Sequence, residues 1–122
     1  MILTVDLVWL LQIAQEKLPG DPDIVDYGAL EAARARHCAI VMGTTVYSQP
    51  HHRAAALLQS LVRLPVLEHS NELYAATVAA AFLKTSGHPV KVSVDQAADL
   101  VEAAANGLDI REIASALSAW TP

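Results

Sequence analysis

Apolar residues recur along most of the chain with the three- and four-residue spacing that marks one face of an α-helix. The first such stretch runs from about residue 6 to residue 18 and carries the stripe Leu7, Leu10, Leu11, Ala14 and Leu18. Pro19 and Gly20 end it, since proline cannot continue a helix and glycine favours a turn. A shorter helix built from alanine, leucine and glutamate is expected over residues 27–36.

The spacing changes in residues 39–49, where Ile40, Val41, Thr44, Thr45 and Val46 gather. β-Branched side chains favour extended backbone, so we expect a loop or a small flap here. Helical spacing returns in residues 51–63 and stops at Pro65.

Residues 72–85 are apolar almost all round, which is typical of a helix surrounded by other helices. We expect the part from Leu73 to Leu83 to be the most buried helix of the protein. Gly87 is its expected end, because glycine adopts the left-handed conformation that often follows a helix.

Two further helices follow, each with its own start signal. Ser93 and Gln96 form a capping box, and after Asn106-Gly107 the pair Asp109 and Glu112 opens the last helix. About six helices with short links predict an all-α fold. We expect a single-domain helical bundle over residues 1–122, arranged around a buried central helix.

Composition and charge exclude several classes of protein. With 53% hydrophobic and 17% charged residues, the chain is neither a disordered tail nor a charged coiled coil. Its net charge of −5 argues against nucleic acid as a direct partner. Residues 1–15 lack the basic start and the cleavage site of a signal peptide, and no apolar run reaches the ~20 residues of a membrane helix. We therefore expect a cytoplasmic protein without a membrane partner. The single cysteine, Cys38, lies in an apolar stretch, and we expect its thiol to be buried and inert.

Reactive side chains concentrate directly before the apolar helix, in Glu68, His69, Ser70 and Asn71. A helix N-terminus presents free N–H groups and suits a phosphate, with which Ser70 and Asn71 could interact. A carboxylate such as Glu68 can hold a divalent metal against phosphate oxygens. The alternative is ordinary helix capping by Ser70 or Asn71, with Glu68 and His69 solvated.

The other histidines carry weaker signals. His51 and His52 are adjacent, so they point to different faces of a helix and do not form a chelating pair. His37 and His88 stand alone in turn-like contexts, where we expect them to be solvated.

Five segments carry a family resemblance: LTVDLVWLLQIAQEKL, DYGALEAARAR, RAAALLQSLVRLPV, AATVAAAFLKTSGH and LVEAAANGLDIREIASAL. Their order along the chain resembles the Doc ("death on curing") branch of the Fic family, and the resemblance covers nearly the whole chain. It implies the helical Fic/Doc fold and the toxin component of a bacterial toxin–antitoxin module. Fic proteins transfer a phosphoryl or nucleotidyl group from a nucleotide such as ATP, with Mg²⁺, to a hydroxyl of a target protein. The Doc branch resembles a kinase that acts on a translation elongation factor.

The family's signature loop reads His-Pro-Phe-x-Asp-Gly-Asn-Lys-Arg, and in this chain its place is taken by LPVLEHSNEL, residues 64–73. Pro65 matches the motif, Glu68 replaces the acidic residue, and Asn71 matches if one residue is inserted after Glu68. Leu64 stands in place of the histidine base. Glu72 and Leu73 stand in place of the Lys and Arg that hold phosphate.

These departures predict a degenerate catalytic loop. If activity remains, the resemblance implies Glu68 as the Mg²⁺ ligand, Ser70 and Asn71 as phosphate-binding residues, and His69 as a substitute base. It also implies a small antitoxin-like partner whose disordered tail folds on binding, beside the flap at residues 39–49 and the catalytic loop. Two alternatives remain open: a non-enzymatic protein-binding module that keeps the Fic/Doc fold, and an unrelated helical bundle.

Overall fold

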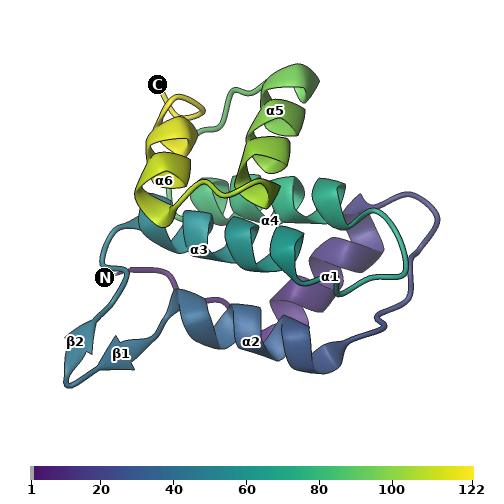
Figure 1. Ribbon diagram of the computed structural model, residues 1–122, viewed down its shortest axis with the longest axis horizontal. Helices are drawn as coiled ribbons and strands as arrows, with labels where there is room; N and C mark the ends of the chain where they lie inside the picture. Colours follow the sequence, from purple (N-terminus) through teal and green to yellow (C-terminus); the bar gives the residue numbers. More distant parts are fainter. Residues whose placement is uncertain (1) are drawn as a thin grey trace.

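The computed structural model describes residues 2–122, in which six α-helices form a bundle and one short β-hairpin projects from its edge (Figure 1). The helices are α1 (Leu7–Lys17), α2 (Tyr27–His37), α3 (Pro50–Arg63), α4 (Asn71–Thr85), α5 (Val94–Ala105) and α6 (Ile110–Ser118). The predicted all-α fold is confirmed. None of the helices in this part of the chain is both long enough and apolar enough to span a lipid bilayer.

The centre of the fold is α3, which contacts α2, α4, α5 and α6. Its residues Ala54 to Leu58 have no solvent-exposed surface. Three of these five residues are alanine, and such small side chains let neighbouring helices approach closely. The apolar stripe of α3 therefore organises the bundle.

The expectation that the helix from Leu73 to Leu83 is the most buried one is wrong on one face. Along α4, Leu73 remains 47% exposed, and Ala76 and Ala80 are half-buried. The reason is that α2 and α6 pack on α3, while α4 contacts only α1, α3 and α5 among the described elements. The opposite face of α4, which includes Tyr74 and Ala79, is fully buried.

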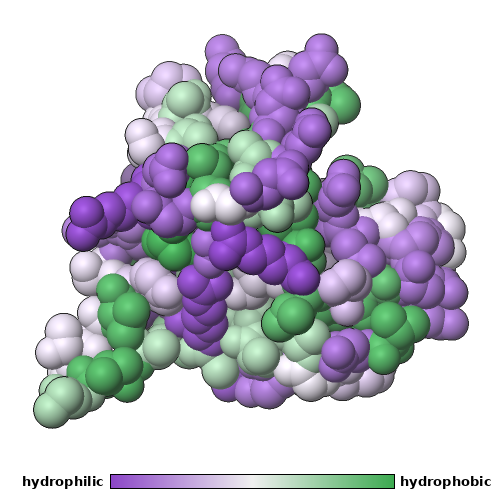
Figure 2. Space-filling model, viewed as in Figure 1, coloured by the Kyte–Doolittle hydropathy of each residue, from purple (hydrophilic) through white to green (hydrophobic). Residues whose placement is uncertain are grey.

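Residues 39–49 form the predicted flap. Strand β1 (Ile40–Val41) pairs antiparallel with β2 (Thr44–Thr45), with Ile40 opposite Thr45. The turn between them places Met42 at φ 51° and Gly43 at φ 77°, and Met42 is 99% exposed. Figure 2 shows this hairpin at the lower left as a projection that carries apolar side chains into solvent.

His37 is fully buried, so the expectation of a solvated side chain is wrong. Its Nε2 accepts a hydrogen bond from the backbone N–H of Val5 at 3.1 Å, and its Nδ1–H donates to the carbonyl of Arg34. Burial is the main cause that lowers the pKa of His37, which keeps the ring neutral and able to accept from Val5. The histidine thus attaches the N-terminal segment to the end of α2.

A second polar side chain fixes the same segment. Arg53 of α3 is 6% exposed and donates to the carbonyl of Leu3 at 3.0 Å, to the hydroxyl of Thr4 and to the carbonyl of Tyr47. These hydrogen bonds satisfy the buried guanidinium without a carboxylate.

Helix ends follow the sequence signals closely. The capping boxes of Ser93 with Gln96 and of Asp109 with Glu112 are both formed. Gly87 follows α4 at φ 95°, as predicted. Cys38 differs from expectation, because it is only half-buried after α2, with its thiol near the carbonyl of Arg34.

The buried face of α4 predicts the effect of a charge placed there. Ala79→Asp introduces a carboxylate at a position with no exposed surface, which should lower the free energy of unfolding by about 3–5 kcal/mol. The matched control, Ala32→Asp on the exposed face of α2, should change it by less than about 0.5 kcal/mol. Urea denaturation measures both, and equal stability of the two variants would contradict the assigned packing of α4.

Candidate functional site

The loop between α3 and α4 lies against the segment that precedes α2. Ile24 and Leu67 form an antiparallel β-bridge, and the carbonyl of Val66 accepts from the backbone N–H of Val25 at 2.8 Å. The N–H of Glu68 donates to the carbonyl of Asp23 at 3.0 Å. The loop is thus held as a short extended strand.

Asn71 shapes this loop from the first residue of α4. Its Oδ1 accepts from the backbone N–H groups of Val66 and Leu67, each at 2.9 Å, and its Nδ2 donates to the carbonyl of Leu67 at 2.9 Å. An asparagine amide offers one carbonyl oxygen and two N–H donors. In this arrangement only one N–H of the Asn71 side-chain amide is left for a ligand.

The predicted residues Glu68, His69 and Ser70 lie side by side on the loop surface. The Oε1 of Glu68 accepts from the backbone N–H of Asp23 at 3.0 Å and lies 3.9 Å from the Nε2 of His69. The Nδ1 of His69 contacts the hydroxyl of Ser70 at 2.8 Å. The structure therefore brings all four predicted residues of the loop together, but their polar atoms mostly contact the loop itself and residue 23.

Ser70 adopts the left-handed conformation, with φ 66° and ψ 26°, and directly precedes α4. No side chain forms a capping hydrogen bond at this helix start, so neither Ser70 nor Asn71 caps α4 in the way that the simpler interpretation predicted. The strained conformation of Ser70 turns the chain from the extended loop into the helix.

The loop lacks several groups that a site for a nucleotide with Mg²⁺ commonly has. Leu64 is 56% exposed and offers no proton acceptor, and Glu72 and Leu73 supply no cation. Arg63, the nearest basic residue along the chain, donates to the carbonyls of Ala104 and Leu108. Within residues 2–122, no three His, Cys, Asp or Glu side chains converge in a way that could hold a metal ion.

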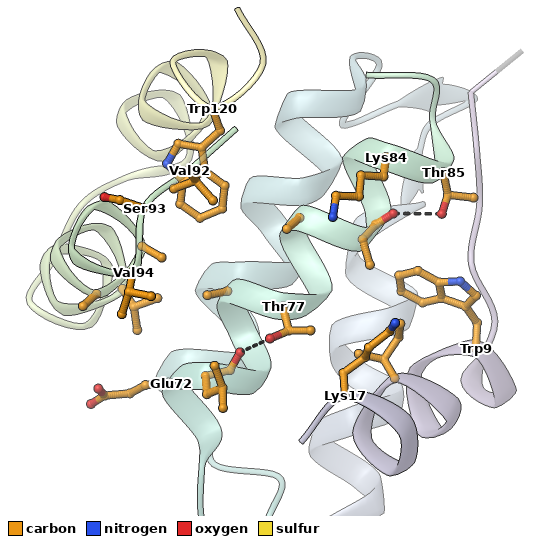
Figure 3. A pocket seen from close by; sticks show the side chains of 18 residues that line it. Trp9, Lys17, Glu72, Thr77, Lys84, Thr85, Val92, Ser93, Val94 and Trp120 are labelled. Carbon is orange, nitrogen blue, oxygen red and sulfur yellow. Dashed lines mark hydrogen bonds between the residues drawn. The ribbon is translucent and has the colours of Figure 1, made fainter. Parts of the chain in front are cut away.

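A larger feature, which the sequence did not reveal, is an apolar groove of about 670 Å³ along the open face of α4. Figure 3 shows Trp9 and Lys17 of α1 on one side, and Val92, Val94 and Trp120 on the other. Its floor consists of small residues of α4, including Ala76, Thr77 and Ala80. A helix such as α4, which is apolar on all sides, is either enclosed by other helices or exposes one apolar face in a groove. The alanines on the exposed face of α4 were the sequence signal for a groove.

Charged residues lie at the margins of the groove. Lys17 and Lys84 both line it, and within the described residues neither forms an ion pair with a carboxylate. Glu72, at the start of α4, lines it too. The groove therefore combines an apolar floor with two lysine cations at its margin.

The site beside the flap, where we expected an antitoxin-like partner to bind, differs in character from the groove on α4. A smaller cleft of about 540 Å³ lies there, and it is bordered by Tyr47, Ser48 and His52 and by Asp109 and Arg111 at the start of α6. Its polar border contrasts with the apolar floor of the groove on α4, and the cleft and the groove share no lining residue.

Comparison with known proteins identifies a relative over most of the chain. The chain is 38% identical over 104 residues to a protein named Toxin Doc from Mycolicibacterium smegmatis, and the match covers 83% of this chain and 80% of that protein. No family model matches the chain. The match extends over most of the six helices.

The hydrogen bonds of Asn71 predict a specific sensitivity of the loop. Asn71→Ala removes all three bonds and should lower the free energy of unfolding by about 1–3 kcal/mol. Asn71→Asp keeps the acceptor for Val66 and Leu67 and should lose less than half as much. Thermal or urea denaturation compares the two, and an equal loss in both variants would show that the accepted bonds do not hold the loop.

Proposed function

Since this chain belongs to the Doc family of toxins, we propose that it is the toxin component of a toxin–antitoxin module with a degenerate phosphotransfer site. The observation that carries this proposal is the chemistry of the loop from Leu64 to Leu73. Position 64 has no proton acceptor, and positions 72 and 73 have no cation. A general base is typically worth about 10²–10⁴-fold in rate, so its loss alone is severe.

Electrostatics at the start of α4 support the same conclusion. Phosphoryl transfer depends on positive groups that hold the phosphates and stabilise the transition state. Glu72 places a negative charge where the family motif has a lysine, and this charge repels a nucleotide. Glu68 and Asn71, the two residues that still resemble the motif, already hydrogen-bond to residue 23 and to the loop backbone.

Residual transfer, if the chain retains any, would rest on the four loop residues. Glu68 would hold Mg²⁺, Ser70 and the free N–H of Asn71 would contact phosphate, and His69 would accept the proton of the target hydroxyl. The target class that the family suggests is a translation factor, which would place the protein in the cytoplasm.

A second candidate function is a non-enzymatic protein-binding module, and the groove along α4 favours it. A groove between helices with a floor of small side chains fits an amphipathic helix, because the backbones can approach closely. Lys17 and Lys84 favour acidic residues on the incoming segment. We propose that an antitoxin-like small protein supplies this segment, and that it binds along α4 instead of beside the flap.

The degenerate loop predicts that the unmodified protein gives no ATP-dependent labelling above background. Labelled ATP, Mg²⁺ and a host cell lysate with added elongation factor provide the assay. Leu64→His alone should not restore labelling, because base catalysis needs a bound and oriented nucleotide.

The triple variant Leu64→His, Glu72→Lys, Leu73→Arg serves as the positive counterpart and should recover weak labelling. Calorimetry with ATP distinguishes the missing base from the missing phosphate-binding cations. Only variants that include the Glu72→Lys substitution should bind nucleotide. Robust labelling by the unmodified protein would overturn the degenerate site and would make His69 the first residue to test as the base.

The groove predicts where partner binding fails. Ala80→Trp fills the floor of the groove and should abolish co-purification of the antitoxin-like chain from the native host. Ala32→Trp, on the exposed face of α2, is the matched control and should leave co-purification unchanged. Circular dichroism verifies that the Ala80→Trp variant is folded. If this folded variant still co-purifies with the partner, the partner binds outside the groove.

A further inference from the structure

Two histidines that are far apart in sequence meet at one end of the bundle. His51 lies in the first turn of α3, and His88 lies in the turn after α4. Their ring centroids are 5.0 Å apart and their planes are inclined by 68°. Both side chains are half-buried, so the pair lies at the surface with access to solvent ions.

The hydrogen bonds of His51 define which of its nitrogens is free. The hydroxyl of Thr121 donates to the carbonyl of Ser118 at 3.3 Å, so toward His51 it acts as the acceptor. The Nε2 of His51 lies 2.8 Å from that hydroxyl and is therefore the ring nitrogen that carries the proton. The Nδ1 of His51 is left with a lone pair and, within residues 2–122, no hydrogen-bond partner.

His88 is also held in place and also free to coordinate. Its backbone N–H donates to the carbonyl of Leu83 at 2.9 Å, which fixes the turn that carries it. No hydrogen bond to either of its ring nitrogens occurs within the described part of the chain. Partial burial, followed by the nearby His88 and His52, lowers the pKa of His51, which favours the neutral, metal-binding form of its ring.

The two rings meet edge to face, and the spacing of their centroids also suits two ligands of one metal ion. Two imidazoles that share a tetrahedral Zn²⁺ have ring centroids about 5 Å apart, because each Zn–N bond is about 2.0–2.1 Å long. Metal-binding histidines commonly donate their second ring N–H to an oxygen, as His51 does to Thr121. From this geometry we infer that His51 and His88 form a binding site for a zinc-like divalent transition metal.

The ligand set also indicates the class of ion and the character of the site. Neutral imidazoles suit Zn²⁺, Ni²⁺ and Cu²⁺, whereas Mg²⁺ requires oxygen ligands. With two protein ligands, the remaining positions belong to water, so the ion is exchangeable. A bound ion would join the start of α3 to the end of α4, beside the Thr121 that follows the groove residue Trp120.

Calorimetric titration of the full untagged chain with Zn²⁺, after treatment with chelator, tests this inference. We expect one equivalent to bind with a submillimolar Kd, and Mg²⁺ to give no binding. His51→Gln and His88→Gln should each weaken Zn²⁺ binding by about 10-fold or more. His52→Gln is the matched control, because it removes the neighbouring imidazole that faces the cleft beside the flap, and it should bind Zn²⁺ like the wild type.

A second measurement needs no variant. In the wild-type protein, Zn²⁺ should shift the imidazole nitrogen signals of His51 and His88 in NMR spectra and leave those of His37 and His69 unchanged. Absence of Zn²⁺ binding, wild-type affinity in both glutamine variants, or an equal loss in His52→Gln would overturn the site.

Discussion

Helix α3 packs against α2, α4, α5 and α6 and so organises the bundle. Four helices contact α3, because its middle is buried on all sides and the small side chains of Ala54, Ala55 and Ala56 let these neighbours approach closely. Alanine loses no side-chain rotamer entropy on burial, so a core rich in alanine can be tight without large aromatic residues. Where aromatics do occur they join elements, as when the buried hydroxyl of Tyr74 donates to the carbonyl of Leu10 at 2.6 Å.

The position of the candidate loop follows from this packing. The loop must connect the end of α3 to the start of α4, and the bridge between Ile24 and Leu67 holds it beside the chain that enters α2. The scaffold therefore keeps the place of the family's catalytic loop. Within this loop, one carboxylate oxygen of Glu68 accepts from the backbone N–H of Asp23, and the Oδ1 of Asn71 accepts from the loop backbone.

The two faces of α4 have different surroundings. One face, with Tyr74 and Ala79, is buried and maintains the fold. The other face, with Ala76 and Ala80, forms the floor of the groove between α1 and α5. The groove shares only Glu72 and Leu73 with the loop, so residues 64–71 can vary without altering the side chains that line it.

Local patterns along the chain are sufficient to predict the helices, their ends and the residue types present in the loop. Capping boxes such as Ser93 with Gln96, and the stop at Gly87, involve residues only a few positions apart, so local pattern is sufficient to predict them. Leu64 has no basic side chain and Glu72 has no cationic one, and both facts follow from the identity of the residue alone.

Contacts between distant segments determine which polar side chains are buried and which apolar side chains remain exposed. His37 becomes a buried acceptor because Val5, 32 residues away, supplies its donor, and His51 meets His88 because α3 and α4 pack side by side. The groove exists because α2 and α6 cover α3 and leave one face of α4 free. Each of these outcomes depends on contacts between distant segments, and periodicity along the chain carries no information about which segment covers which face.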